Sequence, residues 1–320
     1  MEEKNMSQPA VIEVKELIKR YDKEYAINNL SFSVELGSII GLLGPNGSGK
    51  STTINCILSL LSYEQGQIQI FGKPMTPTSY DIKQRIGVVP QDVAVFDELT
   101  VYQNVDYFCG LYIKDKKLRK QYVEESLEIV ELQDFKKYIP KKLSGGLKRR
   151  LNIACGIAHK PELIFFDEPT VAVDPQSRNK ILDSIKKLNE NGSTIVYTSH
   201  YMEEIEQLCT DIIIIDAGQI LARGTKDELK NMINTSELIT IELPNCPTPI
   251  LSYIREMSGV ASLEYNGQQL QINAVKESKV TLKLLHYLET EKIIFGNFYI
   301  SQPTLNDVFL AITGKKLRDE

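Results

Sequence analysis

The sequence has few of the features that mark secreted, metal-binding or nucleic-acid-binding proteins. Its five cysteines are scattered, odd in number and form no C-x-x-C pair, so neither a disulfide framework nor a zinc site is indicated. The formal net charge is −5, whereas nucleic-acid-binding domains usually carry a basic face. We therefore expect a protein of a reducing compartment that has no nucleic-acid partner.

Long apolar runs are also missing. No run approaches the roughly 20 residues that a membrane-spanning helix needs. The opening residues, MEEKNMSQPA, are acidic and polar, whereas a secretion signal begins basic and continues apolar. We see no internal repeat and no low-complexity tract. Any role at a membrane is therefore expected to depend on a partner.

The chain does have the length and the apolar content for two domains. It holds 320 residues, of which 42% are hydrophobic. We predict a first domain over residues 1–232 and a small α+β domain over 233–320. In the second domain we expect a proline-rich loop after the first strand, a helix over about 277–290, and strands over 238–243, 270–275 and 293–300. Thr304 and Asp307 predict the capped start of a last helix, and Gly314 predicts its end.

Residues 44–52, GPNGSGKST, fit the phosphate-binding pattern G-x-x-x-x-G-K-[ST]. The apolar run 38–43 before them predicts a buried strand, and the run 51–61 predicts a helix. Glycines let backbone N–H groups approach phosphate oxygens, and a helix N-terminus adds partial positive charge. A plain glycine-rich turn, the alternative, would not require a lysine and a hydroxyl at this spacing. The predicted nucleotide-binding residues are Gly44, Asn46, Gly47, Ser48, Gly49, Lys50, Ser51 and Thr52.

Two acidic residues follow a second buried strand. The run 163–166, LIFF, is too short for a helix and is typical of a parallel strand that is buried on both faces. We predict that Asp167 and Ser51 act at Mg²⁺ and that Glu168 is the catalytic base. Lys50 is then expected to reach the β- and γ-phosphates of the nucleotide.

Two further polar residues stand at the ends of predicted strands. Gln91 follows the strand 86–89, where its carbonyl oxygen can reach Mg²⁺ or the attacking water. His200 follows the strand 193–198, where an imidazole can hold the γ-phosphate by a hydrogen bond. Each has an ordinary alternative, because glutamine is common in loops and a lone histidine at a strand end is most often structural.

Strand-like alternation over residues 11–37 predicts an antiparallel hairpin ahead of the phosphate-binding loop. Tyr21 ends its first strand, where the ring can stack on an adenine base. The alternative is an ordinary tyrosine at the end of a strand.

Residues 100–160 are predicted to be mostly helical, with one apolar face made of Val123, Leu127, Val130 and Leu132. The many lysines of this region indicate a solvated face or, alternatively, a contact with a partner or a membrane surface. Ser144, Gly145 and Gly146 predict a capped helix start that leaves the backbone open to phosphate. A flexible helix cap is the alternative for these three residues.

Taken in order, these elements resemble the nucleotide-binding domain of ABC transporters over residues 11 to about 232. The resemblance implies a P-loop NTPase of the α/β class, with antiparallel β and helical subdomains, that hydrolyses ATP with Mg²⁺. The small α+β domain would follow it. The matching motifs are the Walker A loop at 44–52, the Q-loop at Gln91, the LSGG signature at 143–146, the Walker B strand at 163–168, the D-loop at Asp174, the switch histidine His200 and the A-loop aromatic Tyr21. Leu147 departs from the usual glutamine of the signature, and VAVD departs from the usual D-loop.

Residues 169–178 and 303–319 look like the drug and antibiotic exporters of the daunorubicin-resistance type. That resemblance implies a head-to-tail homodimer in which Ser144, Gly145 and Gly146 of one subunit close over the ATP of the other. Since the sequence holds one P-loop, separate transmembrane permease subunits are expected, with this chain peripheral at the cytoplasmic face of the cell membrane. Amphipathic antibiotics are the expected cargo. The alternatives are a sodium or lipid exporter, a soluble ABC-type ATPase acting on ribosomes or DNA, and a nucleotide-gated regulator with little turnover.

Overall fold

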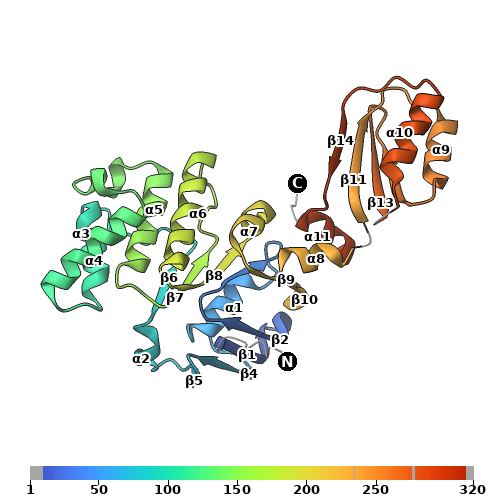
Figure 1. Ribbon diagram of the computed structural model, residues 1–320. Helices are drawn as coiled ribbons and strands as arrows, with labels where there is room; N and C mark the ends of the chain where they lie inside the picture. The colour runs from blue at the N-terminus through green and yellow to red at the C-terminus, as the bar shows by residue number, and fades with distance from the viewer. Residues whose placement is uncertain (1–9, 234, 276–277, 315–320) are drawn as a thin grey trace, which may run out of the picture. The chain divides into compact units, whose positions relative to one another are not determined.

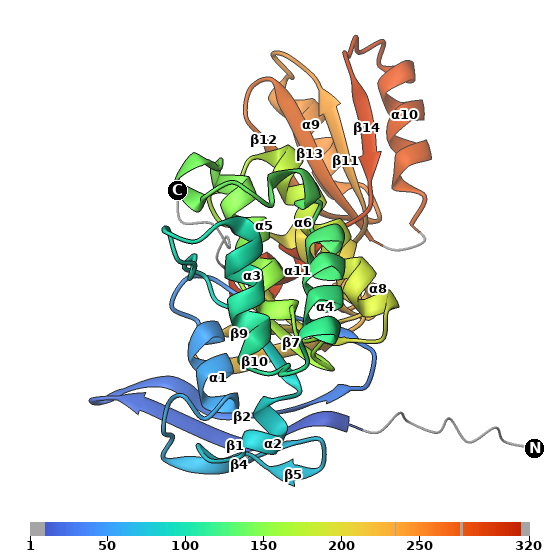
Figure 2. The ribbon, with the colours of Figure 1, turned by 90° about the vertical axis from the view of Figure 1, so that its left-hand side faces the viewer.

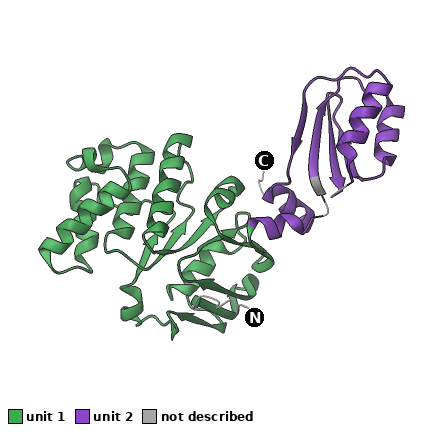
Figure 3. Ribbon diagram, in the orientation of Figure 1, with its two compact units in different colours: residues 1–225, 320 green, residues 226–319 purple. Residues whose placement is uncertain are grey.

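The computed structural model describes residues 10–233, 235–275 and 278–314 of the chain. It divides into two compact units, residues 1–225 with 320 and residues 226–319 (Figure 3). The division falls just before the boundary that the sequence suggests after residue 232. Within the described residues, no helix combines the length and the apolar composition that a membrane span requires.

The first unit is built on a six-stranded sheet in the order β10-β9-β3-β8-β7-β6 (Figure 1). Five of these strands are parallel and β10 is antiparallel to β9, so the carboxyl ends of the parallel strands meet at one edge. The strands predicted near residues 38–43, 86–89, 163–166 and 193–198 are all confirmed. The strands of this sheet are β3 (Ile39–Leu43), β6 (Ile86–Val89), β7 (Leu163–Asp167), β8 (Thr194–Ser199), β9 (Asp211–Asp216) and β10 (Gln219–Gly224).

A second, antiparallel sheet has the order β2-β1-β4-β5 and contains the predicted hairpin. Its strands are β1 (Ala10–Tyr21), β2 (Glu24–Glu35), β4 (Gln65–Ile70) and β5 (Lys73–Pro74). Buried side chains of this sheet pack with those of helix α1 (Lys50–Ile57) and of the six-stranded sheet in one apolar core. Helix α1 and the loop before it are therefore held from both sides.

The region over residues 100–160 is helical, as predicted (Figure 2). Its helices are α3 (Val101–Gly110), α4 (Lys116–Ile129) and α5 (Gly145–Ile157), with 3-10 turns η1 (Gln133–Phe135) and η2 (Pro140–Lys142) between the last two. The predicted apolar face on and after α4 is fully buried. The remaining helices of this unit are α2 (Tyr80–Lys83), α6 (Pro175–Glu190) and α7 (Met202–Leu208).

The second unit contains an antiparallel sheet in the order β12-β13-β11-β14, with α9 and α10 packed on one face (Figure 1). The strands are β11 (Thr235–Glu242), β12 (Val260–Tyr265), β13 (Gln269–Val275) and β14 (Phe298–Ser301). The helices are α8 (Lys226–Asn231), α9 (Thr248–Glu256), α10 (Val280–Thr290) and α11 (Leu305–Thr313). Thr304 caps α11 with Asp307, and Gly314 ends it in the left-handed region, as predicted.

Two expectations for this unit are wrong. The proline-rich segment after β11 is not a loop throughout, because it contains α9 and β12. Prolines are tolerated at the start of a helix, where their missing N–H has no partner to lose; Pro247 is the N-cap of α9, and Pro249 lies in its first turn. The last strand is also shorter than predicted, because residues 293–297 lie outside β14. The predicted helix start at 277 lies outside the described residues.

Candidate functional site

The loop between β3 and α1 brings backbone groups to the edge where the parallel strands end. Gly49 closes this loop with a φ of 102°, and a Cβ atom there would lie 2.4 Å from the carbonyl oxygen of Ala26. Only glycine fits such a position. Helix α1 starts at the next residue, so its free N–H groups face the loop and favour an anion there.

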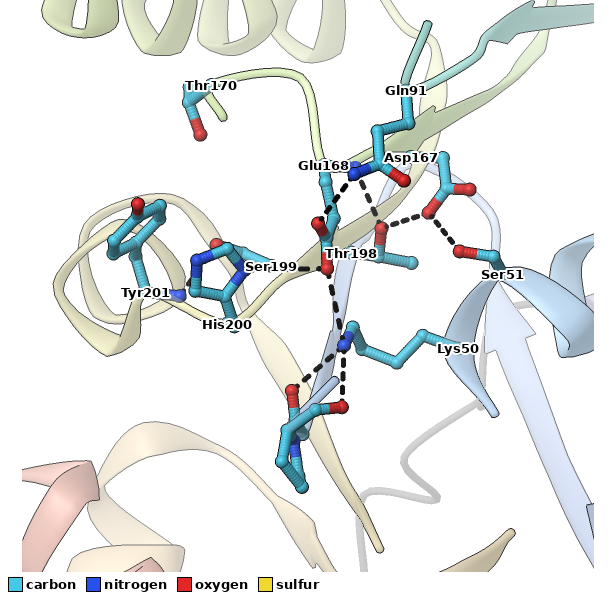
Figure 4. A network of polar contacts seen from close by, with 12 residues as sticks. Lys50, Ser51, Gln91, Asp167, Glu168, Thr170, Thr198, Ser199, His200 and Tyr201 are labelled. Atoms are coloured by element: carbon cyan, nitrogen blue, oxygen red, sulfur yellow. Dashed lines mark hydrogen bonds and ion pairs between the residues drawn. The ribbon is translucent and has the colours of Figure 1, made fainter. Parts of the chain in front are cut away.

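The Lys50 side chain is buried, and it turns back over the loop from which it starts (Figure 4). Its ammonium Nζ donates to the carbonyl oxygens of Gly44 at 2.9 Å and Pro45 at 3.0 Å. The same nitrogen lies 3.3 Å from Oε1 of Glu168. A positive charge is thus fixed between the phosphate-binding loop and the end of β7.

Asp167, the last residue of β7, contacts the first turn of α1. Its Oδ1 accepts hydrogen bonds from the hydroxyl of Ser51 at 3.0 Å and from that of Thr198 at 2.7 Å. Mg²⁺ prefers oxygen ligands and usually takes one or two carboxylates together with substrate phosphates. A hydroxyl and a carboxylate side by side, next to a phosphate-binding loop, therefore fit a magnesium–nucleotide complex.

Glu168 lies at the centre of the polar network (Figure 4). Its Oε1 faces Lys50 and also Nδ1 of His200 at 3.5 Å, and its Oε2 accepts a hydrogen bond from Nε2 of Gln91 at 3.4 Å. Its backbone is in the left-handed region, with φ of 45°, and its N–H donates to the hydroxyl of Thr198 at 2.9 Å. The structure thus brings Gln91 and His200 to the same carboxylate.

A buried carboxylate, Glu204, ties together the loops on either side of the network. Its Oε2 accepts hydrogen bonds from the hydroxyls of Thr170, Tyr197 and Ser199 at 2.8, 2.8 and 2.9 Å, and its Oε1 lies 3.2 Å from Nε of Arg178. Burial, and next the Glu204 charge, raise the pKa of the Tyr197 phenol well above its usual value. That hydroxyl is therefore a neutral donor. Ser199 precedes His200, so Glu204 supports the loop that carries the histidine.

A cavity of about 550 Å³ opens over this network. Tyr21 lines it with a half-exposed ring, and the Lys19 ammonium lies 5.3 Å from the ring centroid. Of the predicted loop residues, Gly44 and Ser48 do not line the cavity within the described part of the chain, although Gly44 contributes its carbonyl to Lys50. The lining consists of Tyr21, Ala26, Asn46, Gly47, Gly49, Lys50, Ser51, Thr52, Gln91, Glu168, Val171 and His200.

The predicted signature residues lie away from this cavity, at the start of α5. Ser144 caps α5, its hydroxyl accepting from the N–H of Leu147 at 3.3 Å. A Cβ on Gly146 would lie 2.1 Å from the hydroxyl of Ser177 and 3.3 Å from Oδ2 of Asp174, so this glycine packs on the start of α6. A Cβ on Gly145 would meet nothing within 4 Å. Within the described part of the chain, neither residues 144–146 nor Asp174 line the cavity beside the P-loop.

Comparisons with known proteins agree with this geometry. The sequence profile described as ABC transporter matches residues 27–171. The linearmycin resistance ATP-binding protein LnrL of Bacillus subtilis (strain 168) is 38% identical, over 97% of this chain and 100% of that protein. The daunorubicin/doxorubicin resistance ATP-binding protein DrrA of Streptomyces peucetius is 31% identical, over 98% of this chain and 96% of that protein. The chain belongs to the ABC transporter ATP-binding proteins.

A solved structure extends the assignment to the reaction. It is described as the dimeric structure of a post-hydrolysis state of the ATP-binding cassette MJ0796 bound to ADP and Pi. It matches this ABC protein with a TM-score of 0.61 and 28% identity, over 67% of this chain and 98% of that chain. This structure confirms the predicted P-loop NTPase fold. The two resistance proteins confirm the predicted membership of the drug-resistance branch. The protein is an ABC ATPase.

Three residues of this ABC ATPase contact the network although the sequence did not suggest them. They are Arg149, Thr198 and Glu204. Thr198 lies in β8 two residues before His200, and Glu204 lies in α7 four residues after it, so proximity to the histidine is the only signal for either residue. The sequence signal for Arg149 is stronger, because it stands beside Arg150 at the start of an otherwise apolar helical run. Both arginines are buried, and buried charges need partners.

Proposed function

We propose that this ABC ATPase hydrolyses ATP in a head-to-tail homodimer and so drives export through separate membrane subunits. The observation that carries the proposal is the division of the phosphate-binding elements. The P-loop cavity gathers Lys50, Gln91, Glu168 and His200, whereas the glycine start of α5 lies outside that cavity and is exposed at Gly145. A second copy, related by a two-fold axis, would supply the missing helix start to each site.

The contacts at the P-loop support a role for each residue. Lys50 would bind the β- and γ-phosphates, and Tyr21 would stack on the adenine. Ser51, Asp167 and Gln91 would hold Mg²⁺, which would supply positive charge to the phosphates. Glu168 would take a proton from the attacking water, and His200 would hold the γ-phosphate by a hydrogen bond. Ser144, Gly145 and Gly146, supported by Asp174, would bind the γ-phosphate of the partner's ATP.

A matched pair of variants at Gly145 tests the divided site. Since a Cβ there meets nothing within 4 Å, Gly145→Asp should fold, and an acid in the first turn favours the helix. Its charge would repel the partner's γ-phosphate, so we expect the ATPase rate to fall about 10²–10³-fold, the range seen when donors to a developing anion are lost. Gly145→Asn has the same shape without the charge and should lose less.

Both Gly145 variants should bind ATP as well as the wild type when measured on dilute monomer by calorimetry. A Gly145→Asp protein with full ATPase activity would contradict the head-to-tail arrangement. A loss of ATP affinity in dilute monomer would mean instead that α5 contributes to the site of its own chain.

An apolar groove beside Gln91 supports contact with membrane subunits. It has a volume of about 330 Å³ and lies between β6, the loop after it, α3 and α5. Leu111 is 62% exposed there, and Tyr112 is stacked on His159 with 3.9 Å between ring centroids. We propose that membrane subunits bind this groove and hold the protein at the cytoplasmic face, so that movement of Gln91 is passed to them.

Export of amphipathic antibiotics is the cargo assignment that the relatives favour, because LnrL and DrrA carry resistance in their names. The test is drug susceptibility in a sensitive host that expresses this chain together with candidate membrane subunits. We expect resistance to a linearmycin- or daunorubicin-like compound, and none when the chain carries Lys50→Ala. Tolerance to sodium alone, with no change in drug susceptibility, would favour the sodium exporter instead.

We propose that the second unit acts as an accessory domain that promotes dimerisation. It contains no phosphate-binding loop, and it has its own apolar core between its sheet and α9 and α10. Helices α8 and α11 contact each other within it, burying Leu229 and Phe309, so a clean truncation ends at Thr225 and not after α8.

The truncated chain should still bind ATP but should need a higher protein concentration for cooperative hydrolysis. ATPase rate measured against protein concentration for both chains decides the matter. An unchanged concentration dependence would show that the second unit has a different role.

A further inference from the structure

Arg149, on the second turn of the helix that starts with the signature glycines, is bound entirely within the chain. Its side chain is buried, with 3% of the residue exposed. Nε donates to the carbonyl oxygen of Pro169 at 2.6 Å, and Nη2 donates to those of Glu168 at 2.8 Å and Asp167 at 3.3 Å. Nη1 donates to the carbonyl oxygens of Pro90, at 3.0 Å, and Gln91.

These carbonyls belong to two loops that carry reacting groups. Pro90 and Gln91 follow β6, whereas Asp167, Glu168 and Pro169 end and follow β7. A guanidinium is planar and presents its N–H donors in fixed directions, so it holds both loops at one separation and orientation. Other arrangements are less favourable, because the carbonyl oxygens of Glu168 and Pro169 would then lose this donor in a buried place.

The backbone of Glu168 shows why such a clamp is needed. Its φ of 45° lies in the left-handed region, which is unfavourable for a residue with a side chain. Thr198 binds its N–H at 2.9 Å and Arg149 binds its carbonyl at 2.8 Å, so both peptide groups around the residue are fixed. This conformation is what directs the carboxylate toward Lys50, Gln91 and His200.

We propose that Arg149 is the positioning residue that holds Gln91 and Glu168 in register with each other and with the signature helix α5. The inference rests on the proposed roles of Glu168 and of the α5 start. When α5 closes on the partner's ATP, Arg149 transmits its position to both loops through direct hydrogen bonds. The arginine touches no reacting atom and acts through the backbone.

The neighbouring Arg150 is a matched control within the same helix. It is also buried, 6% exposed, and burial lowers the pKa of both guanidinium groups from their usual value. It donates to the carbonyl oxygens of Val130 at 3.0 Å and Glu131 at 3.2 Å, which follow α4, away from the two catalytic loops. Loss of either arginine therefore removes a buried donor to backbone carbonyls, but only Arg149 contacts the loops of the site.

The test compares Arg149→Lys with Arg150→Lys. Lysine keeps the charge but is a single ammonium that cannot reach carbonyls of both loops. We expect similar decreases in Tm for the two variants, and wild-type affinity for ATP. The kcat should fall about 100-fold for Arg149→Lys, as for a misplacement of about 1 Å, with KM unchanged. For Arg150→Lys, kcat should stay close to that of the wild type.

Equal loss of kcat in both variants at equal Tm, or a fully active Arg149→Lys, would overturn the proposal. Should Arg149→Lys not fold, Arg149→Gln replaces it, because an amide donates without a buried charge, and the same loss of kcat is expected. Glu168→Gln is measured beside them. If Glu168→Gln is active, the proposed role of Glu168 fails; if it is inactive while the Arg149 variants are active, only the positioning role fails.

Discussion

Replacing Lys50 by alanine is expected to abolish measurable ATP hydrolysis and to weaken ATP binding. The ammonium lies within 3.3 Å of Glu168 and within 3.0 Å of two carbonyl oxygens of the loop, so its position is fixed before it meets a phosphate. A hydrogen bond to a charged group contributes about 1.5–3 kcal/mol, which corresponds to a roughly ten- to hundredfold loss of affinity. Stabilisation of the developing charge contributes about another 10²–10³-fold in rate.

Because Lys50 is buried next to an acid, its loss can also lower stability, and the experiment has to separate the two effects. Lys19 is the matched control: it is the other buried lysine of the described residues, and it lies 3.6 Å from Glu64, outside the catalytic network. Lys19→Ala should lower Tm and retain turnover at saturating ATP, while its contact with the Tyr21 ring limits any effect to ATP affinity. ATPase rate, ATP affinity and Tm are measured for both. Normal ATPase activity in Lys50→Ala would contradict the central assignment.

The parts of the site that the sequence predicted are those in which a chemical demand leaves a local pattern. Phosphate binding requires glycines and a lysine at fixed spacing, as at Gly44 to Lys50. Strands such as β7 are buried on both faces and so appear as short, continuous apolar runs. A polar residue within two positions of the end of such a run, such as Asp167 or Gln91, then falls at the edge where the parallel strands end.

The parts that were missed depend on contacts across the fold. Arg149 binds backbone carbonyls, which every residue possesses, so its partners at Gln91 and Glu168 leave no trace in the sequence. The prolines around 247–249 predict a loop in place of helix α9, because prolines usually end a helix, although they are tolerated at its start. Strand β12 is an edge strand with one buried residue, Leu263, so its apolar alternation is weak.

Glu168→Gln should bind ATP yet hydrolyse it about 10²–10⁴-fold more slowly than the wild type, the range attributed to a general base. The amide has the shape of the carboxylate, and its single oxygen can still accept from Lys50, but it cannot accept a proton from water. Because the proposed dimer separates only after the bridging γ-phosphate is lost, the variant should accumulate as an ATP-bound dimer. Size-exclusion chromatography with Mg²⁺-ATP detects it, and a persistently monomeric variant would count against the dimer.

A double variant shows which surfaces form that dimer. Gly145→Asp combined with Glu168→Gln keeps the P-loop cavity and blocks only the exposed start of α5, where a side chain has open space. It should bind ATP and remain monomeric, whereas Gly145→Asn with Glu168→Gln should dimerise at higher ATP concentration. If the double variant with aspartate still forms the dimer, the trapped species is held together by another surface, and the helix start of α5 does not bind the partner's γ-phosphate.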